Sequence, residues 1–278
     1  MRHSNKGSGE TESRMRNYID GQAGKVSGWL ARESAETISH LALAQIDAGL
    51  RGGVGEIGIH HGKLFLLLYL SLQDGERAFA LDVFEDQQFN VDASGRGDSS
   101  VFMRNFEKVG GDSSRLTIFA KDSCSVNADE VQNATGQLRM MSIDGGHTED
   151  ITRNDMRLAD ELLLDDGILI LDDMYSERWP AVAAGVFRFI LESGSLLRPF
   201  AISPNKTYFC KNQQSAARYR RQLAAGFPEL RLSETTIFGS ELLILGKRSL
   251  VNRVRNYPLV KDNPDLYRRL SSVLHRFR

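Results

Sequence analysis

Apolar residues along the chain follow two spacings, one typical of buried strands and one typical of helices. Short, mostly apolar runs bounded by glycine or polar residues predict strands. They lie at residues 54–59, 77–84, 116–120, 138–143, 167–171, 206–210 and 241–245. Between these runs, apolar residues recur every three or four positions and predict helices. These lie at about residues 34–49, 63–72, 99–109, 148–164, 179–193 and 215–225.

Strands that alternate with helices indicate an α/β fold with right-handed crossovers. The sequence therefore predicts a doubly wound, mostly parallel sheet of seven strands with helices on both faces. A helix at 34–49 precedes the sheet, and residues 29–247 are expected to form one domain. A chain of 278 residues is long enough for such a domain and a sizeable core.

The two ends of the chain have a different composition from the rest. Residues 1–28 are polar with little periodicity, which predicts a flexible tail. Residues 248–278 hold eight Lys or Arg against two Asp, and their apolar residues from 265 onward predict an amphipathic helix. This basic extension would dock on the domain or on a second subunit of a homo-oligomer. The alternative is contact with an anionic membrane surface or a glycolipid.

Composition excludes several classes of protein. The net charge is -1, so no overall field attracts nucleic acid. No apolar run reaches the roughly 18 residues that a membrane span needs. The polar start lacks the apolar segment of a signal peptide, and two cysteines provide no disulfide framework. We therefore expect a cytoplasmic protein.

A glycine-rich turn follows the first predicted strand. Residues 53–58 formally fit G-x-G-x-x-G, but they lie on the strand instead of following it, which argues against a dinucleotide fingerprint. The better register runs from Glu56 through Gly58 to Gly62, which opens the next helix. A glycine at the start of that helix would let a ligand approach the backbone.

Carboxylates follow four of the predicted strands. Asp82 ends the second, Asp122 and Ser123 follow the third, Asp144 follows the fourth, and Asp172 with Asp173 end the fifth. Parallel strands deliver their carboxyl ends to one edge of a sheet, where ligands of open α/β folds bind. His147 comes three residues after Asp144. The edge could therefore hold a divalent cation and take up a proton.

The glycine turn and the first acids resemble those of class I S-adenosylmethionine-dependent methyltransferases. The resemblance implies that Glu56, Gly58 and Gly62 lie against the methionine part of the cofactor. Asp82 would bind the ribose hydroxyls, and Asp122 with Ser123 would face the adenine. These roles agree with chemistry, because hydroxyl and amine donors need carboxylate acceptors.

The segments 142–147 and 170–173 resemble those of the metal-dependent sugar and macrolide O-methyltransferases. That resemblance implies that Asp144, Asp172 and Asp173 bind a divalent cation, usually Mg²⁺, and that Asp144 also lies beside the cofactor. His147 would act as the general base, with Asp144 as its catalytic neighbour. A metal ion lowers the pKa of a bound hydroxyl, and a neutral imidazole can then remove its proton.

We therefore expect a hydroxyl of a sugar or a glycosylated metabolite as the methyl acceptor. Three alternatives remain at this point. A catechol-type O-methyltransferase would use a lysine base, and a non-catalytic module would bind the cofactor without methyl transfer. A nicotinamide dehydrogenase would need a different glycine register.

Overall fold

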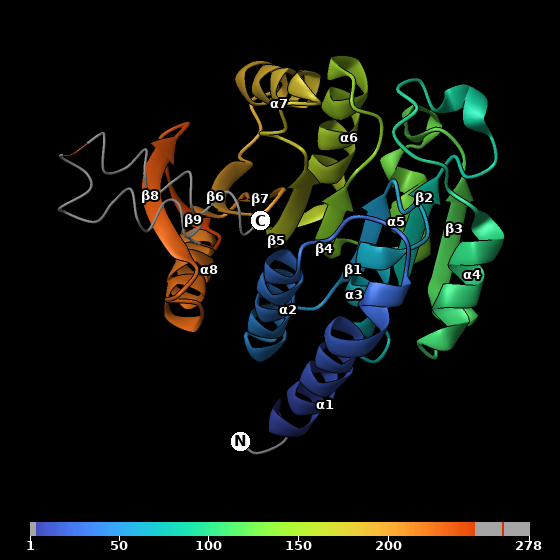
Figure 1. Ribbon diagram of the computed structural model, residues 1–278, viewed down its shortest axis with the longest axis horizontal. Coiled ribbons are helices and arrows are strands. Elements are labelled where there is room, and N and C mark those ends of the chain that lie inside the picture. The colour runs from blue at the N-terminus through green and yellow to red at the C-terminus, as the bar shows by residue number, and fades with distance from the viewer. Residues whose placement is uncertain (1–3, 248–262, 264–278) are drawn as a thin grey trace.

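The sheet predicted from the apolar runs is present in the computed structural model, and it carries nine strands within the described residues (Figure 1). The structure describes residues 4–247 and 263, so the predicted C-terminal helix lies outside the described residues. The strands are β1 Gly53–Ile57, β2 Ala78–Asp82, β3 Leu116–Ala120, β4 Leu138–Ile143, β5 Leu163–Asp172, β6 Arg198–Ser203, β7 Lys206–Cys210, β8 Arg231–Ile237 and β9 Ser240–Leu245.

The strand order is β3-β2-β1-β4-β5-β7-β6-β9-β8. Strands β1 to β5 pair in parallel, whereas β7 is antiparallel to both β5 and β6. Strand β9 is parallel to β6, and β8 closes the edge as its antiparallel neighbour. The mostly parallel α/β architecture is thus confirmed.

The strand count differs from the predicted seven because β6 and β8 carry little apolar signal. Strand β6 begins with Arg198 and Pro199, which interrupt its apolar run. Strand β8 reads Arg-Leu-Ser-Glu-Thr-Thr-Ile and is exposed except at Ile237, as an edge strand can be. Because most of β8 is exposed, its residues do not alternate between apolar and polar, and the sequence does not reveal the strand.

The six helices predicted between residues 34 and 225 are all present, with ends within a few residues of expectation. The helices are α1 Ser4–Asn17, α2 Arg32–Asp47, α3 Lys63–Leu70, α4 Ser99–Lys108, α5 Ala128–Thr135, α6 Glu149–Leu162, α7 Pro180–Glu192 and α8 Gln213–Gly226. Helix α5 was not predicted, although Asn127 and Glu130 form a capping box at its start.

The prediction of a flexible tail at residues 1–28 is wrong, because α1 and the turns after it are packed on the domain. Met15 and Tyr18 are fully buried. The Tyr18 hydroxyl donates to the Lys63 carbonyl at 2.7 Å, and Lys63 Nζ donates to the Gly28 carbonyl at 2.9 Å. The buried residues of this segment include Thr11 and Ala23 beside Met15, Tyr18 and Val26, so few of them are large and apolar, and the sequence shows no clear helical period.

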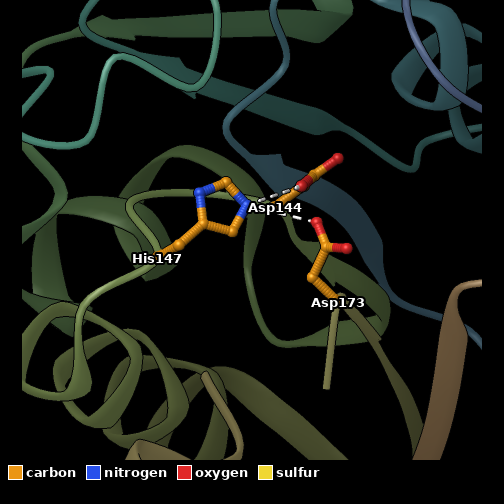
Figure 2. Close-up of side chains that lie close together, drawn as sticks. All are labelled: Asp144, His147 and Asp173. Atoms are coloured by element: carbon orange, nitrogen blue, oxygen red, sulfur yellow. Dashed lines mark ion pairs between the residues drawn. The ribbon is translucent and has the colours of Figure 1, made fainter. Parts of the chain in front are cut away.

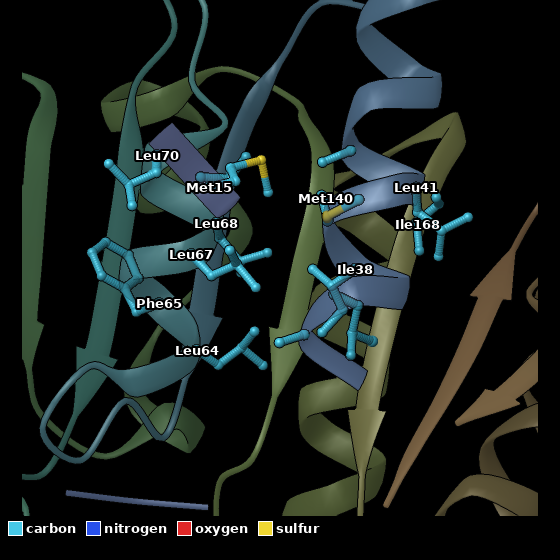
Figure 3. Packing of buried hydrophobic residues seen from close by; sticks show 14 of the residues in the cluster. Met15, Ile38, Leu41, Leu64, Phe65, Leu67, Leu68, Leu70, Met140 and Ile168 are labelled. Carbon is cyan, nitrogen blue, oxygen red and sulfur yellow. The ribbon is translucent and has the colours of Figure 1, made fainter. Parts of the chain in front are cut away.

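Helices cover both faces of the sheet. One apolar cluster lies between the sheet and helices α1 to α4 and α8. Figure 3 shows part of it, with Ile38, Leu67 and Met140 among the labelled members. The second lies between the sheet and α5, α6 and α7, with Met156 and Phe189 in it. Strands β1, β2, β4 and β7 are buried along their whole length, which explains their mostly apolar runs.

None of the helices within residues 4–247 combines the length and the hydropathy that a membrane span requires.

Candidate active site

A cavity of about 320 Å³ opens at the carboxyl ends of β1, β2, β4 and β5. Its walls come from the turns after these strands, from the loop between β2 and α4, and from the segment before α2. It is of the size of small-molecule sites in proteins. Of the predicted site residues, it is lined by Glu56, Gly58, Asp82, Ser123, Asp144, His147, Asp172 and Asp173.

The two glycines of the turn after β1 have different structural roles. Gly58 has φ +81°, and a Cβ there would lie 1.9 Å from the Asp144 carbonyl oxygen, so only glycine allows the β1 and β4 ends to meet. Gly62 has φ +87°, and a Cβ there would lie 2.7 Å from Phe102. Gly62 therefore leaves room for Phe102 to pack against the start of α3. It is not among the described residues that line the cavity.

Asp82 and Glu56 form acidic walls of the cavity. The Asp82 carboxylate accepts the backbone N–H of His60 and that of Phe84, both at 2.7 Å, which fixes its orientation. Burial raises the pKa of Glu56 to about 8, so this carboxyl is largely neutral near pH 7. Within the described part of the chain, Glu56 Oε2 has no hydrogen-bond partner. A ligand with a donor group would satisfy it.

Asp122 and Ser123, the two predicted site residues after β3, have different roles. The Asp122 side chain accepts the Cys124 backbone N–H at 3.0 Å and caps a short turn, and it does not line the cavity. Ser123, which is buried, does line it. Of this pair, Ser123 is therefore the residue within reach of a bound ligand.

The His147 ring is held on three sides. Asp92 Oδ2 accepts the His147 backbone N–H at 2.5 Å and lies 2.9 Å from Nδ1. Asp173 Oδ2 lies 3.2 Å from Nε2. The indole of Trp179 stacks on the ring with 4.3 Å between centroids and 16° between planes. The imidazole therefore has a fixed orientation with Nε2 toward the acidic edge.

These contacts increase the proton affinity of the imidazole. Burial alone lowers the pKa of His147, but the hydrogen bonds to Asp173 and Asp92 outweigh it and raise the pKa above its usual value. A raised pKa strengthens the affinity of the neutral ring for a proton.

Asp144, His147 and Asp173 converge at one point (Figure 2). One ligand atom from each lies within 4.8 Å of the others, and Asp144 Oδ1 is 3.9 Å from His147 Nε2. Asp173 adopts φ +58°, a left-handed conformation that is uncommon outside glycine. The turn after β5 therefore accepts strain where Asp173 points toward the histidine.

Asp172 faces a different partner. Its Oδ2 forms an ion pair with Lys206 Nζ, and its Oδ1 accepts Asn205 Nδ2 at 2.6 Å and the Asp173 backbone N–H at 3.0 Å. Both carboxylate oxygens are thus engaged. Lys206 and Asp172 are each more than nine-tenths buried.

Two of these residues, Asp92 and Lys206, were not anticipated from the sequence. Asp92 lies in the Asp-rich loop between β2 and α4, where nothing in the sequence separates it from Asp86 or Asp98. Lys206 begins an otherwise mostly apolar strand, directly opposite Asp172. A charged residue at the start of such a strand was the one feature of the sequence that could have indicated a role in the site.

The buried Asp155 side chain lies against the turn after β4. It is fully buried on α6, and a Cβ on Gly145 would lie 2.9 Å from its Oδ2. Its Oδ1 accepts Asn154 Nδ2 at 3.2 Å, whereas Oδ2 has no partner among the residues described. Burial raises the pKa of Asp155 to about 7, so the folded protein keeps this carboxyl protonated under mildly acidic conditions.

We expect Asp155 to make stability depend on pH. Between its unfolded pKa near 3.8 and about 7, the unfolded chain loses the proton first, so the free energy of unfolding falls as pH rises. Replacing Asp155 by asparagine should remove up to about 4 kcal/mol of this fall. Urea unfolding from pH 4 to 8 measures it. The control Asp150→Asn changes an exposed carboxyl on the same helix, and a parallel slope in wild type and Asp155→Asn would contradict the expectation.

Comparison with known proteins identifies the domain. Residues 56–174 match the model of a protein family described as a methyltransferase domain. No curated protein sequence matches the chain. The matched segment begins at Glu56 and ends just after Asp173, so it contains most of the cavity residues described above.

Solved structures share the fold at low sequence identity. The O-methyltransferase NovP aligns with 73% of this chain and 98% of its own, at 12% identity and a TM-score of 0.57. CalS11, a TDP-rhamnose 3′-O-methyltransferase of calicheamicin biosynthesis, aligns with 73% of this chain and 93% of its own, at 14% identity and a TM-score of 0.49. An O-methyltransferase from Bacillus cereus aligns with 72% and 89%, at 15% identity and a TM-score of 0.47.

The strand order from β3 to β5, the cavity at the strand ends and the family match agree with the resemblance seen in the sequence motifs. Residues 56–174 are therefore identified as a methyltransferase domain.

Proposed function

We propose that the protein transfers the methyl group of S-adenosylmethionine to a hydroxyl oxygen of a sugar or a glycosylated small molecule. The observation that carries this proposal is the arrangement around His147. An imidazole fixed by Asp92 and Trp179, with Nε2 directed at Asp144 and Asp173, is suited to remove a proton from a hydroxyl group in the cavity.

The cofactor would occupy the part of the cavity that Glu56, Asp82 and Ser123 line. Asp82, held by two backbone N–H groups, retains lone pairs for the ribose hydroxyls. Glu56 Oε2 offers an acceptor without a partner among the described residues. Both contacts match the donors of S-adenosylmethionine.

A divalent cation fits the other part of the cavity. Asp144 and Asp173 supply carboxylate oxygens of the kind that Mg²⁺ prefers, close enough to share one ion. Asp172 fits less well, because both its oxygens already have partners. When bound, such an ion would lower the pKa of an acceptor hydroxyl.

The transfer itself balances simply. The acceptor oxygen attacks the sulfonium methyl carbon, the carbon–sulfur bond breaks, and S-adenosylhomocysteine leaves. The hydroxyl proton passes to His147 Nε2, while Asp92 keeps Nδ1 in place. Fixing the reactants in line contributes much of the remaining rate enhancement.

The catechol-type alternative, which relies on a lysine base, finds little support. Within the described residues, the Lys206 ammonium is paired with Asp172, and Lys63, which lines the cavity, donates to the Gly28 carbonyl. Burial lowers the pKa of Lys206, but the neighbouring carboxylates outweigh this and raise it above its usual value. A lysine held in its charged form cannot accept a proton.

The proposal is tested by supplying the full chain with S-adenosylmethionine, Mg²⁺ and a panel of acceptors. Methyl glycosides, nucleoside diphosphate sugars and catechol cover the alternatives, with S-adenosylhomocysteine release as the readout. We expect release with sugar acceptors and a methyl ether in the product. Release with catechol alone, or with no acceptor of the panel, would count against the sugar proposal.

Asp82 provides a test of the cofactor site that needs no acceptor. We expect Asp82→Asn to weaken S-adenosylhomocysteine binding by about ten- to hundredfold, because a hydrogen bond to a charged group contributes about 1.5–3 kcal/mol. Calorimetry measures the dissociation constant. Asp86→Asn, an exposed aspartate of the following loop, is the control, and equal affinities in the two variants would place the ribose elsewhere.

A further inference from the structure

We propose that the Lys206 ammonium is a permanent positive charge among the carboxylates at the ends of β4 and β5, Asp144, Asp172 and Asp173. By its ion pair with Asp172 it keeps this carboxylate from coordinating a divalent ion. A metal would then be confined to the side of the cavity formed by Asp144 and Asp173. This inference rests on the methyl-transfer site proposed above. It gives Lys206 a positioning role, since it acts through the carboxylates and not on the substrate.

The sheet itself creates the pair. Strands β5 and β7 run antiparallel, and their register places Asp172 directly opposite Lys206. Directly opposed residues of an antiparallel pair lie within contact distance, and opposite charges there are favourable. Asn205, one residue earlier, donates to the second oxygen of Asp172 at 2.6 Å. The carboxylate is thereby fixed from two sides.

The charge of Lys206 reaches beyond Asp172. Its Nζ also lies 3.9 Å from Asp144 Oδ2. Four carboxyl groups, Glu56, Asp144, Asp172 and Asp173, thus share one end of the sheet with one buried ammonium. Without it, Asp172 would be a buried carboxylate lacking a counter-charge, which is unfavourable in a protein interior.

A site that used Asp172 as a metal ligand would have to break this pair. The ammonium would remain buried after losing its closest partner, and it would lie next to a divalent ion of like charge. Asp144 and Asp173 can approach an ion together with His147 while the closest ion pair of Lys206, with Asp172, stays intact. The existing contacts therefore favour a site in which Asp172 is support and not ligand.

The experiment uses Mn²⁺ as the probe, with its affinity for the full chain measured by calorimetry. Replacing Lys206 by methionine removes the like charge and frees Asp172, so we expect Mn²⁺ to bind at least about tenfold more tightly, a change of 1.4 kcal/mol. The double variant Lys206→Met/Asp172→Asn removes the whole pair. Its Mn²⁺ affinity should return to within about threefold of wild type, because Asp144 and Asp173 remain.

Lys211→Met is the matched control. Lys211 follows the other end of β7 and also contacts an aspartate, with Nζ 3.6 Å from Asp160, but it does not line the cavity as described. Its loss should leave Mn²⁺ binding unchanged. Thermal unfolding and S-adenosylhomocysteine binding of each variant report whether the fold is intact, and the double variant is the safeguard if Lys206→Met alone does not fold.

The outcomes separate this inference from the proposed function. If wild type binds Mn²⁺ and the double variant loses tenfold or more, Asp172 is a ligand and the inference is wrong, while metal assistance stands. If Lys206→Met binds Mn²⁺ and wild type does not, the inference holds and metal assistance is wrong. If no variant binds Mn²⁺, both are wrong.

Discussion

Replacing His147 by alanine should lower kcat about 10²- to 10⁴-fold on any acceptor that releases S-adenosylhomocysteine, because a positioned base contributes about that factor. The dissociation constant for S-adenosylhomocysteine should change little, since the ring contacts Asp92, Asp173 and Trp179 on the acceptor side. Steady-state kinetics and calorimetry measure the two effects. Turnover at the wild-type rate would remove His147 from the mechanism.

Asp92 allows a sharper form of this test. If it acts by fixing Nδ1, Asp92→Asn should lower kcat in the wild type but have no further effect in the His147→Ala background. Asp86→Asn, in the same loop but exposed, should be neutral. A loss of activity from Asp92→Asn that persists without the histidine would point to a role in folding the loop instead.

Replacing Gly58 by alanine should destabilise the protein severely and disturb both halves of the site. The left-handed φ of +81° costs a side chain about 1–2 kcal/mol. The new Cβ would also lie 1.9 Å from the Asp144 carbonyl oxygen, so the ends of β1 and β4 would have to separate. We therefore expect a loss of several kcal/mol in the free energy of unfolding, together with weakened S-adenosylhomocysteine binding.

Gly49→Ala is the control for this variant. Gly49 has a similar φ of +73°, but a Cβ there meets nothing within 4 Å. It should therefore show the backbone cost alone, without the contact. Urea unfolding of the two variants measures the difference, and equal losses would mean that the approach of Gly58 to Asp144 is not what requires glycine.

The sequence predicts well which acids lie together at one edge of the sheet, because their positions depend only on where the strands end. Once β1, β2, β4 and β5 are parallel neighbours, Glu56, Asp82, Asp144 and Asp173 must share an edge. No knowledge of side-chain conformation is needed for this. The resemblance in the sequence motifs rests on the same positions, which explains why the fold and the methyltransferase domain could both be predicted.

The details depend on contacts that have no sequence period. The Asp122 side chain caps its own turn, and Ser123 lines the cavity instead. The partner of Asp172 depends on the register between β5 and β7, which no local pattern specifies. Asp92 reaches His147 across 55 positions of sequence through a loop whose course the composition does not define.

The packed N-terminal segment has a practical consequence for shortened forms of this protein. A chain that began at Trp29 would lose Met15 and Tyr18 from the interior and the carbonyl of Gly28 that Lys63 binds. Ser27 and Gly28, which line the cavity, would go with them. Removing the segment that the sequence predicts to be a flexible tail would therefore open a wall of the cavity.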